Sequence, residues 1–147
     1  MKVLFVCRAN LGRSQMASAF FDQLSQHTPE SAGTIAARIG GEGRTVLQRL
    51  QDYPDENATL PMLVDIMNEQ GLRISSGRQT QLTPELVDAA DRVMVMAQRD
   101  SWPDYLVEGE KVTYWDIEDP LNITKETAQQ VVDQAKAKVE ELVREIG

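Results

Sequence analysis

Residues 3–17, VLFVCRANLGRSQMA, carry a thiol and a guanidinium at the two ends of one short loop. Cys7 is the only cysteine of the 147-residue chain, and it stands where the apolar run 3–6 stops. Arg13 follows six residues later, next to Ser14, where a helical pattern starts. A cation and a helix N-terminus both favour the thiolate, the reactive form of cysteine. We therefore take Cys7 as a candidate nucleophile.

The loop after the thiol also has the features of an anion site. Its backbone N–H groups can surround a tetrahedral oxyanion, and the first turn of the next helix adds further N–H groups. Gly12 permits a backbone geometry that most residues resist. Arg13 can offer a planar fork to two oxygens, and Ser14 can hydrogen-bond the sulfur. The pattern predicts a nucleophile in an anion-binding loop, with these residues around the anion: Arg8, Ala9, Asn10, Leu11, Gly12 and Ser14.

A purely structural interpretation of the same loop stays open. A cysteine at a strand end is often an inert buried residue. Arg13 could lie on the helix surface, and Ser14 could be an N-cap. The position of the loop favours the functional interpretation, because parallel sheets bind their ligands at the carboxyl ends of strands.

Attack on a phosphate monoester needs an acid that protonates the leaving oxygen. The segment 114–120, YWDIEDP, follows the last predicted strand and offers Asp116, Glu118 and Asp119. The proline after Asp119 biases this residue to an extended backbone, although Asp-Pro is also common in simple turns. Considered together with the thiol loop, Asp119 is the candidate acid.

These loops need a scaffold, and the rest of the chain supplies strands that alternate with helices. Apolar runs predict strands at 3–6, 92–97 and 111–115, with a weak signal near 30–34. Helical spacing predicts a helix that starts at Ser14 and further helices over 60–71, 83–91 and 125–147. Alternation of this kind favours a parallel sheet covered by helices on both faces.

Two of the predicted helices have a clear apolar face. The face of the first helix consists of Met16, Phe20, Phe21 and Leu24. The face of the last helix consists of Ala128, Val132, Ala135, Val139, Leu142 and Ile146. The segment 38–59 is different, because it holds three of the nine glycines and only a short helical pattern. It is either a disordered loop or a structured flap at the rim of a single domain, 1–147.

Composition narrows the class of protein. The net charge of −8 argues against nonspecific binding to nucleic acid. A single cysteine excludes an internal disulfide framework and a multi-cysteine metal site. The chain has no apolar stretch near 18 residues and no signal peptide, so we expect a cytoplasmic protein without a membrane partner.

The thiol loop resembles the C-x5-R-S phosphate-binding loop of the low-molecular-weight protein tyrosine phosphatases. It is also similar to the related thiol-dependent arsenate reductases, which share the phrase N-x-x-R-S-Q-M-A. The segments 31–34, 82–96 and 116–120 recur in matching order. The resemblance implies a three-layer α/β/α fold with a four-stranded parallel sheet of order 2-1-3-4.

The resemblance also implies roles for individual residues. Cys7 matches the nucleophile and Arg13 the arginine that binds phosphate. Asn10 matches the asparagine that holds the loop in shape, and Ser14 the serine that stabilises the thiolate. Asp119 matches the general acid, which later acts as a base. The reaction of the family needs no metal and no cofactor.

Three departures from the family keep alternatives open. Gly12 stands where many of the phosphatases have a second cysteine, and the relay cysteines of the thioredoxin-coupled reductases are missing. Leu121 and Asn122 replace the tyrosines that follow the Asp-Pro of the eukaryotic phosphatases; Tyr53 could supply an aromatic contact instead. The leading hypothesis is a phosphatase acting on phosphotyrosine in proteins or on small aryl phosphates. The alternatives are an arsenate reductase that uses Cys7 with an external small thiol, and a non-catalytic module that binds an oxyanion or a phosphopeptide.

Overall fold

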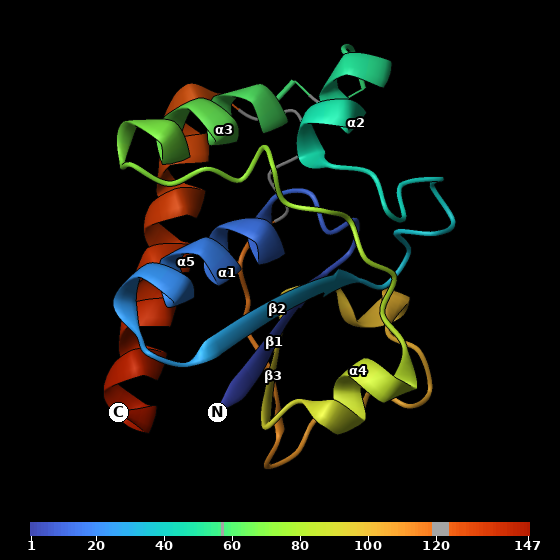
Figure 1. The fold of residues 1–147 in the computed structure, drawn as a ribbon, viewed down its shortest axis with the longest axis vertical. Coiled ribbons are helices and arrows are strands. Elements are labelled where there is room, and N and C mark those ends of the chain that lie inside the picture. The colour runs from blue at the N-terminus through green and yellow to red at the C-terminus, as the bar shows by residue number, and fades with distance from the viewer. Residues whose placement is uncertain (57, 119–123) are drawn as a thin grey trace.

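The architecture is that of a computed structural model, which describes residues 1–56, 58–118 and 124–147. Four strands form one sheet in the order β2-β1-β3-β4 (Figure 1), and each neighbouring pair is parallel. The strands are β1 (Lys2–Cys7), β2 (Thr28–Gly33), β3 (Arg92–Val95) and β4 (Val112–Tyr114). The predicted strand order 2-1-3-4 is confirmed.

Helices cover both faces of this sheet. α1 and α5 lie on one face and α4 on the other, while α2 and α3 lie above the carboxyl ends of the strands (Figure 1). The α-helices are α1 (Arg13–Leu24), α2 (Val46–Asp52), α3 (Leu60–Glu69), α4 (Pro84–Ala89) and α5 (Lys125–Ile146), and a short 3-10 helix covers Arg99–Ser101. The predicted three-layer α/β/α fold is therefore correct.

The central strand β1 is buried on both sides, as its unbroken apolar run requires. Successive side chains of a strand point to opposite faces, so β1 supplies two separate cores. Val3 and Phe5 pack with α1 and α5. The rings of Phe5 and Phe21 meet edge to face, with their centroids 5.4 Å apart. Leu4 and Val6 pack in the second core, which includes α4. Cys7, the last residue of β1, is on the α1–α5 side.

The apolar faces predicted for the two long helices need one correction. α5 buries the predicted residues from Ala128 to Leu142, and Ile146 is partly buried against the same core. Leu24, assigned to the apolar face of α1, is exposed. The reason is that Leu24 is the last residue of α1, where the chain turns away toward β2.

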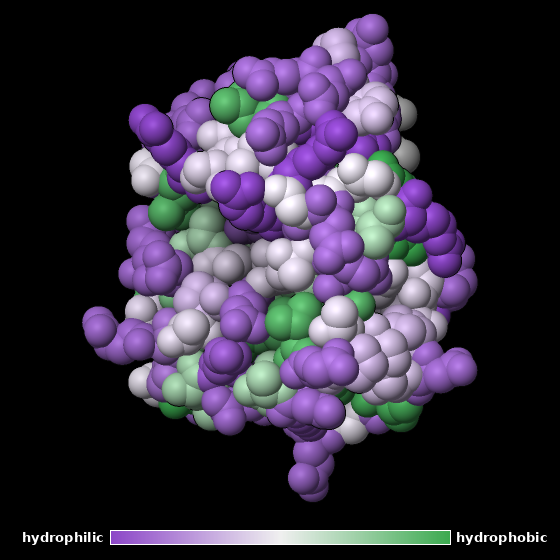
Figure 2. Space-filling view, turned by 45° about the vertical axis from the view of Figure 1, so that its right-hand side comes forward, coloured by the Kyte–Doolittle hydropathy of each residue, from purple (hydrophilic) through white to green (hydrophobic). Residues whose placement is uncertain are grey.

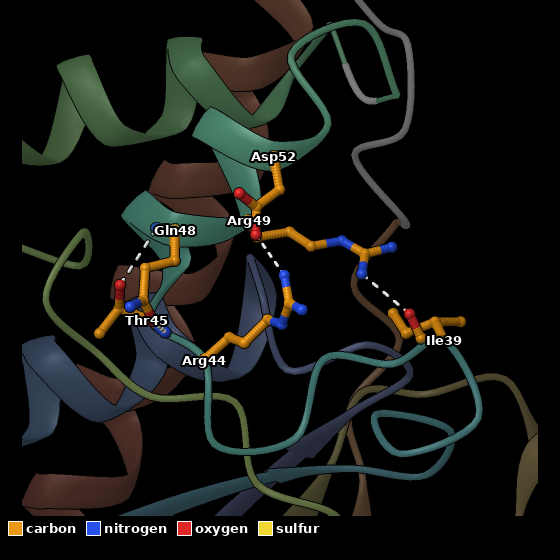
Figure 3. A network of polar contacts seen from close by, with 6 residues as sticks. All are labelled: Ile39, Arg44, Thr45, Gln48, Arg49 and Asp52. Atoms are coloured by element: carbon orange, nitrogen blue, oxygen red, sulfur yellow. Dashed lines mark hydrogen bonds and ion pairs between the residues drawn. The ribbon is translucent and has the colours of Figure 1, made fainter.

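The segment 38–59 contains α2 within its described residues. Thr45 caps this helix, since its Oγ1 accepts from the backbone N–H of Gln48 at 3.1 Å (Figure 3). The side chain of Gln48 accepts in return from the N–H of Thr45 at 2.8 Å. This reciprocal pair is a capping box, which holds a seven-residue helix that would be marginal alone.

The outer surface in the view of Figure 2 is mostly hydrophilic, with hydrophobic residues in small groups. In the described part of the chain, no helix combines the length and the apolar character needed to cross a bilayer.

Candidate active site

The thiol of Cys7 is held in a fixed polar environment at the carboxyl end of β1. Its side chain is buried, and the backbone N–H of Asn10 donates to Sγ at 3.2 Å. Ser14 Oγ lies 3.0 Å from the same sulfur. Because Ser14 Oγ accepts from Asn10 Nδ2 at 2.7 Å, its own hydroxyl hydrogen can point to Sγ. The structure thus directs two hydrogen-bond donors at one sulfur.

The loop between β1 and α1 turns its carbonyl groups outward. The carbonyl oxygens of Cys7 and Arg8 accept from the N–H groups of Thr34 and Ile35, both at 3.0 Å. The carbonyl of Ala9 accepts from a glutamine side chain outside the loop. In a trans peptide the N–H points opposite to the C=O, so the N–H groups of these peptides point away from the partners of their carbonyls. The Asn10 N–H, the last of the three, donates to Sγ, and an oxyanion above Cys7 would meet this side of the loop.

The strained residue of this loop is Asn10. Its φ is +60°, in the left-handed region that asparagine tolerates better than most residues. The side chain stabilises this geometry, because Oδ1 accepts from the N–H of Thr80 at 2.8 Å while Nδ2 binds Ser14. The sequence assigned the unusual backbone geometry to Gly12, but Gly12 has a φ of −114° and does not use the positive φ open to glycine. The positive φ of the loop therefore belongs to Asn10.

Arg13 is buried at the first position of α1 and lines the cavity above Cys7. Its Nη1 donates to the carbonyl of Met96 and to that of Ile117, the latter at 3.2 Å. These carbonyls follow β3 and β4, so the guanidinium is fixed at the carboxyl edge of the sheet. A surface position for Arg13 is excluded.

Two glutamines support the loop and were missed by the sequence analysis. Gln79 Nε2 donates to the carbonyl of Ala9 at 2.9 Å, and Gln15 Nε2 donates to that of Asn10 at 3.0 Å. Both glutamines are buried. Gln79 also uses its backbone N–H to bind the carbonyl of Arg44 near α2. Glutamine is ordinarily a surface residue. Gln15 belongs to the phrase N-x-x-R-S-Q-M-A, but nothing in the sequence assigns either glutamine a role in holding the loop.

A cavity of about 210 Å³ opens above the thiol, between the loop and the helices α2 and α3. The loop supplies Cys7, Arg8, Ala9, Leu11, Gly12 and Arg13 to its lining. The opposite wall comes from Ile35, Ile39, Arg49, Leu50, Tyr53, Glu56, Leu60 and Leu63. Most of this wall is apolar, and Tyr53 is half-exposed at its edge. The arrangement can bind an anion at the loop and an apolar or aromatic group beside it.

The candidate acid Asp119 lies outside the described residues, as do Leu121 and Asn122. The two other carboxylates of that segment, Asp116 and Glu118, are exposed. Within residues 1–56, 58–118 and 124–147, no group of three or more His, Cys, Asp or Glu side chains is placed to hold a metal ion.

Sequence comparison finds one family across almost the whole chain. A model of the family described as "Low molecular weight phosphotyrosine protein phosphatase" matches residues 2–147. A probable low molecular weight protein-tyrosine-phosphatase EpsP of Ralstonia solanacearum is 37% identical over 94 residues, which is 64% of this chain and 54% of that protein. The match thus spans about half the length of this curated relative.

Solved structures share the fold. Wzb of Vibrio vulnificus in complex with benzylphosphonate has a TM-score of 0.77 at 19% identity, covering 99% of this chain and 98% of that one. A structure described as an arsenate reductase in the phosphate binding state has a TM-score of 0.73 at 28% identity, covering 99% of this chain and 98% of that one.

Proposed function

Because the chain belongs to the low molecular weight phosphotyrosine protein phosphatase family, we propose that it hydrolyses phosphotyrosine or aryl phosphate monoesters through a cysteinyl-phosphate. The observation that carries the proposal is the pair of contacts on Cys7 Sγ, from the Asn10 N–H at 3.2 Å and Ser14 Oγ at 3.0 Å. A non-catalytic binding module would have no need of a thiol held by two polar contacts at the floor of its cavity.

In the first step the thiolate of Cys7 attacks phosphorus. The Sγ–P bond forms as the bond from phosphorus to the leaving oxygen breaks. Asp119 donates a proton to that oxygen, and the free alcohol or phenol departs. Arg13 and the N–H groups of the loop bind the remaining phosphoryl oxygens, whose charge is spread over the transition state.

In the second step water attacks the cysteinyl-phosphate. Asp119, now a carboxylate, accepts a proton from the water, and the Sγ–P bond breaks to release inorganic phosphate. Cys7 returns as a thiolate, which the Asn10 N–H and Ser14 stabilise as the leaving group. The cycle consumes only the phosphate ester and water.

An aromatic leaving group is supported by the wall opposite the loop. The apolar side chains of Ile39, Leu50 and Leu60 line the cavity with the ring of Tyr53. Aromatic rings pack well against such a surface. The substrate class we propose is therefore a phosphorylated protein carrying phosphotyrosine, or a small aryl phosphate.

The direct test is hydrolysis of p-nitrophenyl phosphate by the purified protein, with Cys7→Ser as the matched variant. We expect the wild type to release phosphate without an added partner, and Cys7→Ser to be inactive while its circular dichroism stays native. Serine is far harder to ionise than a thiol in this environment. Turnover by a folded Cys7→Ser protein would overturn the mechanism.

An arsenate reductase is the second candidate, favoured by the 28% identity to the arsenate reductase structure. Arsenate has the shape and charge of phosphate and fits the same loop chemistry. Its reduction to arsenite takes two electrons, which two thiols supply by forming one disulfide. Since Cys7 is the only cysteine of the chain, the second thiol must come from outside.

The two candidates are separated by assays with arsenate and added thiols. We expect no useful arsenate reduction with thioredoxin alone, because the chain lacks the further cysteines that would attack the arsenate adduct. Glutathione serves as the control, since a small thiol can reach the adduct. Fast arsenate reduction with glutathione and negligible aryl phosphatase activity would make the reductase the correct function.

A further inference from the structure

The wall of the cavity holds a buried arginine that the proposed reaction does not use. Arg49 of α2 lines the cavity with Cys7, yet only 5% of the residue is exposed. We propose that Arg49 is a second anion site, which binds a carboxylate of an acidic phosphopeptide while the phosphate occupies the Cys7 loop. The inference rests on the proposed function, because it assumes that a phosphoryl group binds at Cys7.

The guanidinium of Arg49 is only partly satisfied. Nη1 donates to the carbonyl of Ile39 at 2.8 Å (Figure 3), and Nη2 donates to Glu56 Oε1 at 2.7 Å. Nε is buried and has no hydrogen-bond partner among the described residues. Nε and Nη2 form the side edge of the guanidinium, which matches both oxygens of one carboxylate. Glu56 uses only half of this edge.

Glu56 is held loosely enough to be replaced. Its side chain is 45% exposed, whereas that of Arg49 is 6% exposed. An ion pair with one exposed partner contributes little stability, because water competes for that partner. A ligand carboxylate that reaches both Nε and Nη2 would make two charge-assisted hydrogen bonds in place of one. Glu56 would then turn into solvent at small cost.

The surroundings of Arg49 fit an anion. Of the described residues that line the cavity, Arg8, Arg13 and Arg49 are basic and Glu56 is the one that is acidic. The ring of Tyr53 lies 4.3 Å from the Arg49 guanidinium carbon, so it supports the cation from one face. A phosphate at the loop leaves Arg49 as a further positive group in the opposite wall. An acidic residue next to phosphotyrosine is the chemistry that this wall would recognise.

The neighbouring ion pair supplies a matched control. Arg44, which precedes α2, pairs with Asp52, the last residue of this helix (Figure 3), and neither residue lines the cavity. Asp52 is 47% exposed at its side chain, close to the value for Glu56. Asp52→Asn and Glu56→Gln therefore change the net charge equally, but only the second removes the carboxylate that occupies Arg49.

The experiment compares two phosphotyrosine peptides that differ only in having glutamate or glutamine on both sides of the phosphotyrosine. The quantity measured is the ratio of kcat/KM for the acidic peptide to that for the neutral one. We expect Glu56→Gln to raise this ratio about two- to fivefold over wild type, and Asp52→Asn to leave it unchanged. Arg49→Met lowers the ratio below wild type and removes the effect of Glu56→Gln.

Equal shifts by Glu56→Gln and Asp52→Asn would reveal a general charge effect and overturn the proposal, as would an unchanged ratio in Glu56→Gln. If Arg49→Met does not fold, the proposal is tested by comparing the kcat/KM ratio of Glu56→Gln with that of Asp52→Asn. Turnover of the neutral peptide reports separately on the proposed function. If neither peptide is hydrolysed, their binding to the same variants in a Cys7→Ser background, measured by calorimetry, tests the Arg49 site without turnover.

Discussion

Asn10 connects three parts of the site through one residue. Its backbone N–H reaches Cys7 Sγ, its Nδ2 reaches Ser14 Oγ, and its Oδ1 accepts from the Thr80 N–H. The thiol and Ser14 come from the motif itself, so their proximity could be predicted from the sequence. The bond to Thr80 could not, because it joins residues 70 positions apart. The same holds for Arg49, whose position in the wall depends on how α2 packs.

At the scale of this residue, we expect Asn10→Ala to destabilise the protein by about 2–4 kcal/mol, because the Thr80 N–H loses its acceptor, Ser14 Oγ loses a donor and alanine resists a positive φ. Urea unfolding measures the change. Asn68→Ala, at an exposed position of α3, is the control and should stay within about 0.5 kcal/mol of wild type. If Asn10→Ala leaves the free energy of unfolding unchanged, the side-chain amide of Asn10 does not hold the loop.

For Asp119→Asn we expect a decrease in kcat that becomes larger as the pKa of the leaving group rises. General acid catalysis contributes about 10²–10⁴-fold where the leaving oxygen must be protonated, and less for an activated aryl phosphate. The measurement is kcat over a series of phenyl phosphates. Asp116→Asn and Glu118→Gln are the controls, and a larger loss in either one would mean that Asp119 is not the acid.

At the scale of the element, the end of β2 fixes the shape of the anion loop. A Cβ on Gly33 would lie 2.8 Å from the Arg8 carbonyl oxygen and 2.9 Å from Asn10 N. These are backbone atoms, so they cannot move aside without a shift of the loop. β2 therefore positions the candidate site although it supplies no group to the proposed reaction.

We accordingly expect Gly33→Ala to lower kcat/KM for p-nitrophenyl phosphate at least tenfold, since displacement of an anion loop by a fraction of an ångström weakens transition-state binding. Gly109→Ala is the control, because a Cβ at Gly109 meets nothing within 4 Å. Equal activities of the two variants would show that the loop tolerates the shift.

The elements differ in how well the sequence predicted them. The helix predicted over 83–91 is present as α4, and Thr83 Oγ1 accepts from the Leu86 N–H as an N-cap does. β2 gave a weak signal because it is an edge strand of small and polar residues, with Pro29 inside it. For the segment 38–59 the sequence leaves a disordered loop and a structured flap open, although Thr45 and Gln48 have the spacing of a capping box.

At the scale of the whole molecule, most of the buried core lies away from the candidate site. The two cores beside β1 lie between the sheet and its helices, and Cys7 joins the first of them to the thiol loop at the carboxyl edge of the strands (Figure 1). The strand order was predicted by resemblance, because periodicity finds strands but does not say which ones are neighbours. The packing of α2 over the loop depends on long-range contacts that no local pattern encodes.

This separation predicts that Leu142→Ala, in the buried face of α5, lowers the free energy of unfolding by about 2–5 kcal/mol and leaves kcat/KM unchanged. Thermal unfolding and the aryl phosphatase assay measure the two quantities. Val107→Ala, at a residue that is 68% exposed, is the control and should change neither. A fall in kcat/KM for a folded Leu142→Ala protein would show that the core and the site are coupled.

Because Cys7 is the only thiol of the protein, a thiol-directed reagent can be used to titrate the candidate site. Every cysteine-directed label that enters the native chain must enter at Cys7, since the 147 residues hold no second cysteine. After treatment with an alkylating reagent, the fraction of molecules whose mass rises by one label gives the fraction of the preparation with a reactive Cys7. We expect inorganic phosphate or vanadate to slow the labelling, because an oxyanion bound in the loop covers the thiol. The decrease in the labelling rate therefore measures how much of the loop is occupied. Ligand affinities can be measured in this way without any substrate being turned over.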